Sequence, residues 1–211
     1  MNHLLSKIGS YPFEKLNLLL KDIKPSKDVI NLSIGEPKLS ADSKVLDILN
    51  KETNSFSNYP PMNAVPELSE AYRQYLKSHF GIKNVAEDEV CLVAGTREGT
   101  FSIIQALFNK ENVKDKPYVV MPNPFYQIYG GATTLAGGEA KFLDCPEEDN
   151  FQPDLDSLKS EDWQKCQILV LCSPNNPTGS VLPLSKLKDI LDLADKYDFY
   201  VVSDECYVDL Y

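Results

Sequence analysis

The sequence predicts an α/β protein with a mainly parallel sheet and helices on both faces. From residue 89 onward, short apolar runs rich in β-branched residues alternate with helical patterns. Apolar runs that are bounded by turns and separated by helices are typical of parallel strands buried on both faces. The composition agrees, because 211 residues with 43% apolar and 25% charged side chains can bury a sizeable core.

The first 85 residues are expected to form helices and connectors. An amphipathic segment around Phe13, Leu16 and Ile23 predicts a helix, and a short extended piece (VINLSIG) comes after it. Further helices are expected near 41–52 and over 66–80. Pro66 suits a first helical turn and Gly81 suits a helix end, so this last helix has clear boundaries.

The remainder is expected to alternate between strands and helices. The expected helices cover 97–109, 124–136 and 183–197. The expected strands are EVCLVAG at 89–95, YVVM at 118–121, EAKFLD at 139–144, QILVLCS at 167–173 and FYVVSDE at 199–205. Because the chain stops at Tyr211, just after a strand and without a closing helix, we expect it to be a truncated part of a longer protein.

Charge and composition exclude several classes of function. With 31 acidic and 21 basic residues the net charge is −10, which repels phosphate backbones and anionic lipids, so no nucleic-acid or membrane partner is expected. The two histidines, His3 and His79, are too few for a zinc site or a Ser-His-Asp triad, so no metal is expected. The N-terminus lacks a secretion signal, and the five cysteines are odd in number and scattered; a cytoplasmic location with reduced thiols is expected.

Ligands of parallel sheets gather outside the carboxyl ends of the strands, so the residues just after each expected strand are the candidates for a site. Gly95-Thr96-Arg97 precedes a helix and places free backbone N–H groups and a positive dipole end where a phosphate could sit. The alternative is a simple strand-to-helix turn that uses glycine for its geometry. The spacing matches neither G-x-G-x-x-G nor a Walker loop, which disfavours a dinucleotide or ATP.

The other strand ends carry groups suited to a planar cofactor. Tyr126 comes after the second expected strand and could stack on a flat ring, although packing between helix and sheet is the commoner fate of such a residue. The turn Ser173–Gly179 holds an asparagine pair between two prolines, and Asp204 and Tyr207 lie at the end of the last strand. A phosphate site, a ring, an amide, an anion and a phenol together match the needs of pyridoxal 5′-phosphate.

These segments resemble those of a known family. IGEP at 34–37, NPFYQIYGG at 123–131, NNPTG at 175–179 and SDECY at 203–207 are similar to segments of fold-type I, class I and II pyridoxal-phosphate aminotransferases. Within that group, YPFEKL at 11–16 and INLSIGEPK at 30–38 resemble bacterial N-succinyldiaminopimelate aminotransferases of lysine biosynthesis. The resemblance implies a homodimer that uses an amino-acid donor and 2-oxoglutarate. It also implies an N-terminal arm with part of a small domain over 1–40 and an incomplete cofactor-binding domain over 41–211.

The resemblance assigns roles residue by residue. Asp204 would face the ring nitrogen and keep it protonated, since an adjacent anion favours the cationic form. Asn176 and Tyr207 would hydrogen-bond the phenolic oxygen, and Tyr126 would stack on the ring. The phosphate would be held by Gly95, Thr96, the Arg97 backbone and, from the neighbouring subunit, Tyr59. Substrate contacts would come from Gly35, Asn176 and Arg97, where Arg97 either anchors a distal carboxylate or pairs with a local acid such as Glu98.

Two departures from the family pattern matter. Ala64-Val65 replaces the usual glycine near Tyr59, and the Schiff-base lysine of the family has no counterpart in residues 1–211, so this chain alone is expected not to transaminate. Two other functions stay open. One is a different pyridoxal-phosphate reaction, by another amino-acid aminotransferase or a C–S lyase, and the other is a non-catalytic fragment or binding module.

Overall fold

The computed structural model describes residues 2–35, 39–57, 59, 66–111 and 116–210. It divides into two compact units, one made of Met1–Ser10 with Val93–Tyr211 and the other of Tyr11–Leu92. The predicted division into 1–40 and 41–211 concerns the domains of a longer enzyme and stays a prediction.

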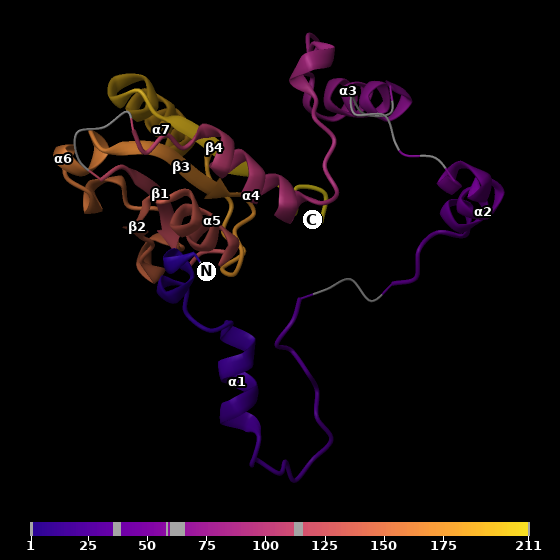
Figure 1. Ribbon diagram of the computed structural model, residues 1–211, viewed down its shortest axis with the longest axis horizontal. Coiled ribbons are helices and arrows are strands. Elements are labelled where there is room, and N and C mark those ends of the chain that lie inside the picture. Colours follow the sequence, from indigo (N-terminus) through magenta and orange to yellow (C-terminus); the bar gives the residue numbers. More distant parts are fainter. Residues whose placement is uncertain (1, 36–38, 58, 60–65, 112–115, 211) are drawn as a thin grey trace. The chain divides into compact units, whose positions relative to one another are not determined.

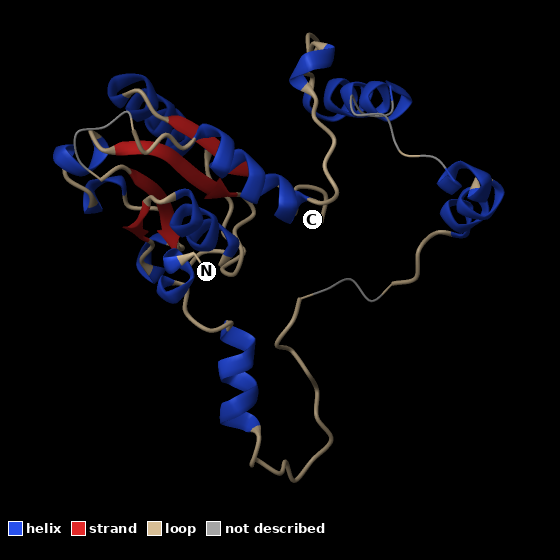
Figure 2. Ribbon diagram, viewed as in Figure 1, coloured by secondary structure: helices blue, strands red, loops and turns tan. Residues whose placement is uncertain are grey.

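The first unit contains a four-stranded, wholly parallel sheet (Figures 1 and 2). Its strand order is β2-β1-β3-β4. The strands are β1 (Tyr118–Asn123), β2 (Glu139–Asp144), β3 (Cys166–Cys172) and β4 (Tyr200–Asp204). Four of the five expected strands are therefore confirmed.

Helices cover both faces of this sheet, which confirms the predicted α/β class. On one face α4 (Thr96–Leu107) and α5 (Ile128–Ala136) pack against Val119, Ile168 and Val170. On the other face α6 (Ser160–Trp163) and α7 (Leu184–Tyr197) pack against Val120, Leu169 and Leu171. Successive residues of β1 and β3 thus enter opposite cores, because side chains alternate across a strand. The two central strands, β1 and β3, are therefore buried on both faces and are rich in apolar residues.

The second unit is helical among its described residues. Its α-helices are α1 (Pro12–Leu20), α2 (Ser43–Lys51) and α3 (Pro66–Phe80), which confirms the three helices expected there. The Asp42 side chain caps α2 by accepting a hydrogen bond from the Lys44 N–H at 2.8 Å. Gly81 comes after α3 with φ of +70°, a left-handed conformation that glycine adopts without strain. The short 3₁₀ helices of the chain are η1 (His3–Lys7), η2 (Thr53–Ser57), η3 (Glu87–Glu89), η4 (Glu147–Asp149) and η5 (Leu155–Ser157).

Two predicted elements are corrected. The expected strand at 89–95 is wrong: Glu89 closes η3, and residues 90–95 belong to no strand. Val90 is extended, with φ of −116° and ψ of 115°, but no strand pairs with it among the described residues, and a β-strand needs a hydrogen-bonded partner. The helix expected from residue 124 begins instead at Ile128, because β1 runs on to Asn123 and a turn comes after it.

Candidate functional site

The strand order places a ligand-binding position at the carboxyl ends of β1 and β3. From β1 the chain moves to β2 on one side, and then returns to build β3 and β4 on the other side. Open parallel sheets bind ligands outside the carboxyl ends of the strands where the order reverses in this way. Tyr126 lies just beyond β1, and the turn Ser173–Gly179 lies just beyond β3.

Asp204 ends β4 directly beside this position. It pairs in register with Cys172 of β3, and its carbonyl oxygen accepts a hydrogen bond from the Ser173 N–H at 3.2 Å. Its half-buried carboxylate accepts from the Tyr129 hydroxyl through Oδ2 at 2.8 Å and from the Cys206 N–H through Oδ1 at 3.3 Å. Two donors from different segments therefore orient the carboxylate.

Tyr129 is the site residue that the sequence analysis missed. It lies on α5, is 1% exposed, and its ring meets that of Tyr126 edge-to-face at 5.8 Å between centroids. Burial, reinforced by the hydrogen bond to Asp204, raises the pKa of the Tyr129 hydroxyl far above its ordinary range. The phenol therefore stays protonated and remains a donor. Its spacing of three residues from Tyr126 is the one signal that would have placed both rings on one side of a helical turn.

The turn after β3 meets the segment after β4 through Asn176 and Tyr207. The Asn176 Nδ2 lies 3.4 Å from the Tyr207 hydroxyl oxygen, to which it donates. Burial is the main reason that the pKa of Tyr207 is raised, so this phenol is also neutral at physiological pH. The structure thus brings together two residues that the sequence analysis had assigned to one cofactor atom; the assignment itself stays a prediction.

The predicted phosphate cradle lies at the start of α4. Gly95 precedes the helix with extended backbone (φ of 165°), and as the N-cap residue it provides no side-chain hydrogen bond to the helix N-terminus. The first N–H groups of a helix have no intrahelical acceptor and lie at the positive end of the helix dipole. Because α4 packs against β3 and β4, this end belongs to the same unit as Asp204.

Arg97 in the first turn of α4 is exposed and forms no ion pair with the residues that the structure describes. The alternative of a local pair with Glu98 is therefore not found. The Glu98 carboxylate instead folds back toward Gly95, since a Cβ added there would lie 2.8 Å from its Oε2. The proposed role of Arg97 as an anchor for a substrate carboxylate stays a prediction.

Gly35 and Tyr59 belong to the second unit. Gly35 has open space around it, and Tyr59 is fully exposed. Their predicted contacts with substrate and with the neighbouring subunit's phosphate stay predictions. Residues 36–37 of the IGEP segment, and Ala64 and Val65, lie outside the described residues.

Two thiols adjoin Asp204 and are neutral. Cys172 is 4% exposed and donates to the Pro174 carbonyl oxygen at 3.1 Å. Burial is the largest cause of the raised pKa of Cys172, and burial together with Asp204 raises the pKa of Cys206 to about 12. A thiol needs a lowered pKa to act as a nucleophile near neutral pH, so this arrangement does not favour cysteine chemistry.

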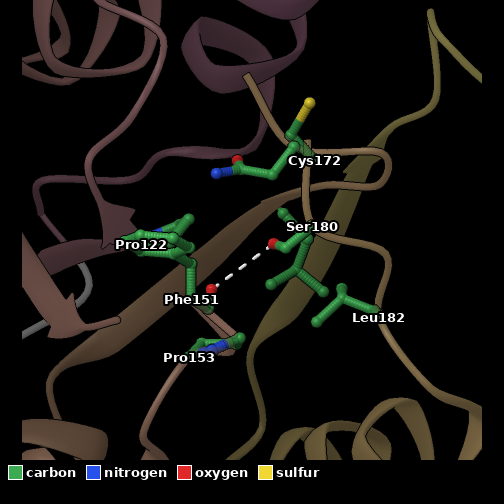
Figure 3. A pocket seen from close by; sticks show the side chains of 8 residues that line it. Pro122, Phe151, Pro153, Cys172, Ser180 and Leu182 are labelled. Atoms are coloured by element: carbon green, nitrogen blue, oxygen red, sulfur yellow. Dashed lines mark hydrogen bonds between the residues drawn. The ribbon is translucent and has the colours of Figure 1, made fainter. Parts of the chain in front are cut away.

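A small hollow lies between the ends of β1 and β3 and the segment around Phe151 (Figure 3). Its lining is mostly apolar, and the Ser180 hydroxyl at its edge donates to the Phe151 carbonyl oxygen at 3.4 Å. The lining residues are Pro122, Phe151, Pro153, Leu171, Cys172, Asn175, Ser180 and Leu182. Its free volume of about 10 Å³ is far too small for a planar cofactor.

Two other kinds of site are not found in the described part of the chain. Within the described ranges, no group of three or more His, Cys, Asp or Glu side chains is placed to hold a metal ion. None of the helices over 2–35, 39–57, 66–111 and 116–210 combines the length and the apolar character needed to span a membrane.

The sheet, the strand-end aspartate and the uncapped helix define a class of cofactor-binding α/β protein, and sequence comparison gives its family. Residues 27–211 match the family model "Aminotransferase class I and II", so the chain belongs to this family. The enzymes of this family depend on pyridoxal 5′-phosphate.

Individual relatives agree with that membership. An aspartate aminotransferase of Pyrococcus horikoshii is 30% identical over 194 residues, covering 92% of this chain and 48% of that protein. LL-diaminopimelate aminotransferase 2 of Nostoc is 28% identical and covers 98% of this chain and 53% of that protein. A crystal structure of an aminotransferase from Neisseria meningitidis superimposes with a TM-score of 0.90 at 41% identity, over 98% of this chain and 52% of that one. The chain thus spans about half the length of the relatives it matches.

The residues present fit the family's cofactor. Asp204 offers an oriented anion for a protonated ring nitrogen, and the uncapped start of α4 offers N–H donors for a phosphate. The Asn176 and Tyr207 pair offers polar groups for the phenolic oxygen. These groups come from four strand or helix ends of one compact unit.

Proposed function

We propose that the chain is the cofactor-binding part of an aminotransferase that moves an amino group from an amino-acid donor to 2-oxoglutarate. The observation that carries this proposal is the Asp204 carboxylate, fixed by a buried tyrosine at the carboxyl edge of the sheet. A carboxylate oriented at such an edge is suited to pair with a protonated pyridine nitrogen. The family membership supports the same function.

Each residue of the site has a defined task in this proposal. When bound, pyridoxal 5′-phosphate supplies an electron sink for negative charge at the α-carbon of an amino acid. Asp204 keeps the ring nitrogen protonated, and the neutral Tyr129 hydroxyl prevents the carboxylate from turning away. Asn176 and Tyr207 hold the phenolic oxygen, and Tyr126 covers the ring. The N–H groups of Gly95, Thr96 and Arg97 bind the phosphate through charge-assisted hydrogen bonds.

We further propose that the donor is a diamino acid with more than one carboxylate, of which N-succinyl-LL-diaminopimelate is the leading example, in lysine biosynthesis. The relatives support a donor with more than one carboxylate, because their names include LL-diaminopimelate and aspartate aminotransferases and both of these amino acids carry two carboxylates. The exposed Arg97 supports it as well, since it has no ion pair among the described residues and a guanidinium can bind a distal carboxylate bidentately.

The remaining parts of the proposal concern the whole enzyme. We propose that it is a cytoplasmic homodimer, with Tyr59 reaching the partner's cofactor and Gly35 close to the substrate. We also propose that residues 1–40 contribute to its small domain and 41–211 to its large domain. The relatives are about twice as long as this chain, which supports the proposal that the catalytic lysine lies outside these residues.

The test uses the purified full-length enzyme that the gene encodes. We expect glutamate to form from 2-oxoglutarate with N-succinyl-LL-diaminopimelate, LL-diaminopimelate or aspartate as donor. Asp204→Asn should lower kcat by about a hundredfold or more, because it removes a fixed charge from the reacting system. Asp195→Asn, on the exposed side of α7, is the matched control and should leave kcat unchanged.

Other results identify the alternatives. Release of pyruvate and a thiol from a cysteine conjugate, without glutamate, would show a C–S lyase. Binding of the cofactor without any turnover would show a binding module. An Asp204→Asn variant as active as the parent would contradict the role of the carboxylate.

A further inference from the structure

The two asparagines of the turn after β3 have different surroundings. Asn176 is half-buried, and its amide meets Tyr207 on the cofactor side. Asn175 is 8% exposed and lines the hollow beside the turn, together with Phe151, Pro153 and Leu182. Neighbouring identical side chains thus have different partners and surroundings.

Asn175 ties the segment from 175 to 180 together. Its N–H donates to the Ser180 carbonyl oxygen at 2.9 Å, and its carbonyl oxygen accepts from the Gly179 N–H at 2.7 Å. Its side-chain Nδ2 donates to the Thr178 hydroxyl oxygen at 2.8 Å. These three bonds span Asn176 and Pro177, so they hold the backbone that carries the Asn176 amide.

Stability alone does not explain an asparagine here. Its Oδ1 is buried and makes no hydrogen bond with the residues described, and an unmade hydrogen bond destabilises a buried polar group by about 1–3 kcal/mol. A leucine in its place would lie among the mostly apolar lining residues, such as Phe151 and Leu182, without that penalty. Local choices that oppose stability are expected at functional sites.

We propose that Asn175 is a positioning residue that holds Asn176 in place for the cofactor. It acts through the Thr178 hydroxyl and does not touch the cofactor. The inference rests on the proposed function, because it concerns the cofactor-facing amide of that same site.

The experiment compares Asn175→Leu with the parent in the full chain. We expect Asn175→Leu to keep or raise the melting temperature. The hydrogen-exchange protection of the Gly179 amide should fall about tenfold, and the affinity for pyridoxine 5′-phosphate should fall about fivefold or more. This probe carries the ring and phosphate but no aldehyde, so surface lysines cannot capture it, and calorimetry measures its binding. A purely structural role would lower the melting temperature together with the affinity.

Gln152→Leu is the matched control. Gln152 also has a buried amide oxygen without a partner among the described residues, but its Nε2 donates to the Val181 carbonyl oxygen, outside the turn. We expect it to leave the affinity and the Gly179 protection unchanged. Thr178→Val removes the acceptor of Asn175 Nδ2 and should act in the same direction as Asn175→Leu. Thr178→Val also removes the bonds of this hydroxyl to the Ser180 hydroxyl and N–H. The double variant should therefore be no weaker than Thr178→Val alone, because Thr178→Val already breaks the bond to Asn175.

The outcomes distinguish failure of the positioning role from failure of the proposed function. If the parent binds the probe and Asn175→Leu binds it equally well with Gly179 still protected, the positioning role is wrong and the proposed function stands. If the parent does not bind the probe, the proposed function fails, and the Gly179 exchange in Asn175→Leu and Thr178→Val alone decides whether Asn175 orders the turn. Additive losses in the double variant would also overturn the proposal.

Discussion

At the scale of single residues, the contact between Tyr129 and Asp204 joins two segments that are 75 residues apart in sequence. The carboxylate of Asp204 is only half-buried, so the Tyr129 hydroxyl mainly restricts its orientation. Because burial keeps that hydroxyl protonated, the contact persists throughout the physiological pH range.

Removing this hydroxyl should weaken cofactor binding. We expect Tyr129→Phe to lower the affinity for pyridoxine 5′-phosphate about five- to tenfold, as the loss of a hydrogen bond worth about 1 kcal/mol implies. Calorimetric titration measures the effect. Tyr200→Phe, at the exposed start of the same strand as Asp204, removes a hydroxyl far from the site and should bind the probe as the parent does. Equal affinities for both variants would contradict a role for Tyr129.

At the scale of elements, the sheet depends on close packing between α4 and the start of β2. A Cβ added to Gly138 would lie 2.5 Å from the ring of Phe108, which is buried at the end of α4. Such a contact requires the ring or the backbone to move. The glycine therefore allows α4 and α5 to lie together over one face of the sheet.

Gly138→Ala should destabilise the protein by about 1–3 kcal/mol through this overlap. Chemical denaturation monitored by circular dichroism gives the change in the free energy of unfolding. Gly131→Ala, within α5 and with open space around its Cβ position, should be neutral or slightly stabilising. If both variants unfold at the same denaturant concentration, the predicted overlap with Phe108 does not destabilise the protein, and this prediction is wrong.

Cys166, the first residue of β3, makes the stability of the folded protein vary with pH in the alkaline range. Burial raises the pKa of the Cys166 thiol to about 12, against an ordinary value of 9.0. The folded state therefore keeps a proton that the unfolded state loses, so the contribution to stability is present below pH 9 and is lost as the pH rises toward 12. We expect the melting temperature to fall over this range and to fall less steeply in Cys166→Ala. If the melting temperature falls equally steeply with pH in both proteins, the Cys166 thiol does not cause the loss of stability.

At the scale of the whole molecule, the hydrogen bonds described for the candidate site do not involve a lysine. Asp204 accepts hydrogen bonds from Tyr129 and Cys206, and Asn176 donates one to Tyr207. We therefore expect the 211-residue chain to bind pyridoxal 5′-phosphate without a covalent bond. Borohydride reduction and subsequent mass spectrometry should find no single lysine carrying a pyridoxyl group. One specifically modified lysine would contradict this prediction and would identify the catalytic residue.

The sequence predicted the local features of this protein. Apolar runs such as Ile168–Cys172 predicted buried parallel strands, and Pro66 and Gly81 marked the ends of a helix, because these signals depend on neighbouring residues only. The same reasoning wrongly predicted a strand at 89–95, since a run of suitable residues forms a strand only where another strand pairs with it.

The position of the candidate site was also predictable, because the residues proposed to bind the cofactor in the first unit lie at or close to the ends of strands and the start of a helix. Which residues support those groups was decided by the tertiary structure alone. Tyr129 reaches Asp204 only because α5 packs against β3 and the parallel register places Asp204 beside Cys172 at the end of β3. In the same way, only the tertiary structure shows that Asn175 lines the hollow and that Asn176 contacts Tyr207. Contacts between distant segments depend on how the elements pack, and no spacing along the chain records that packing.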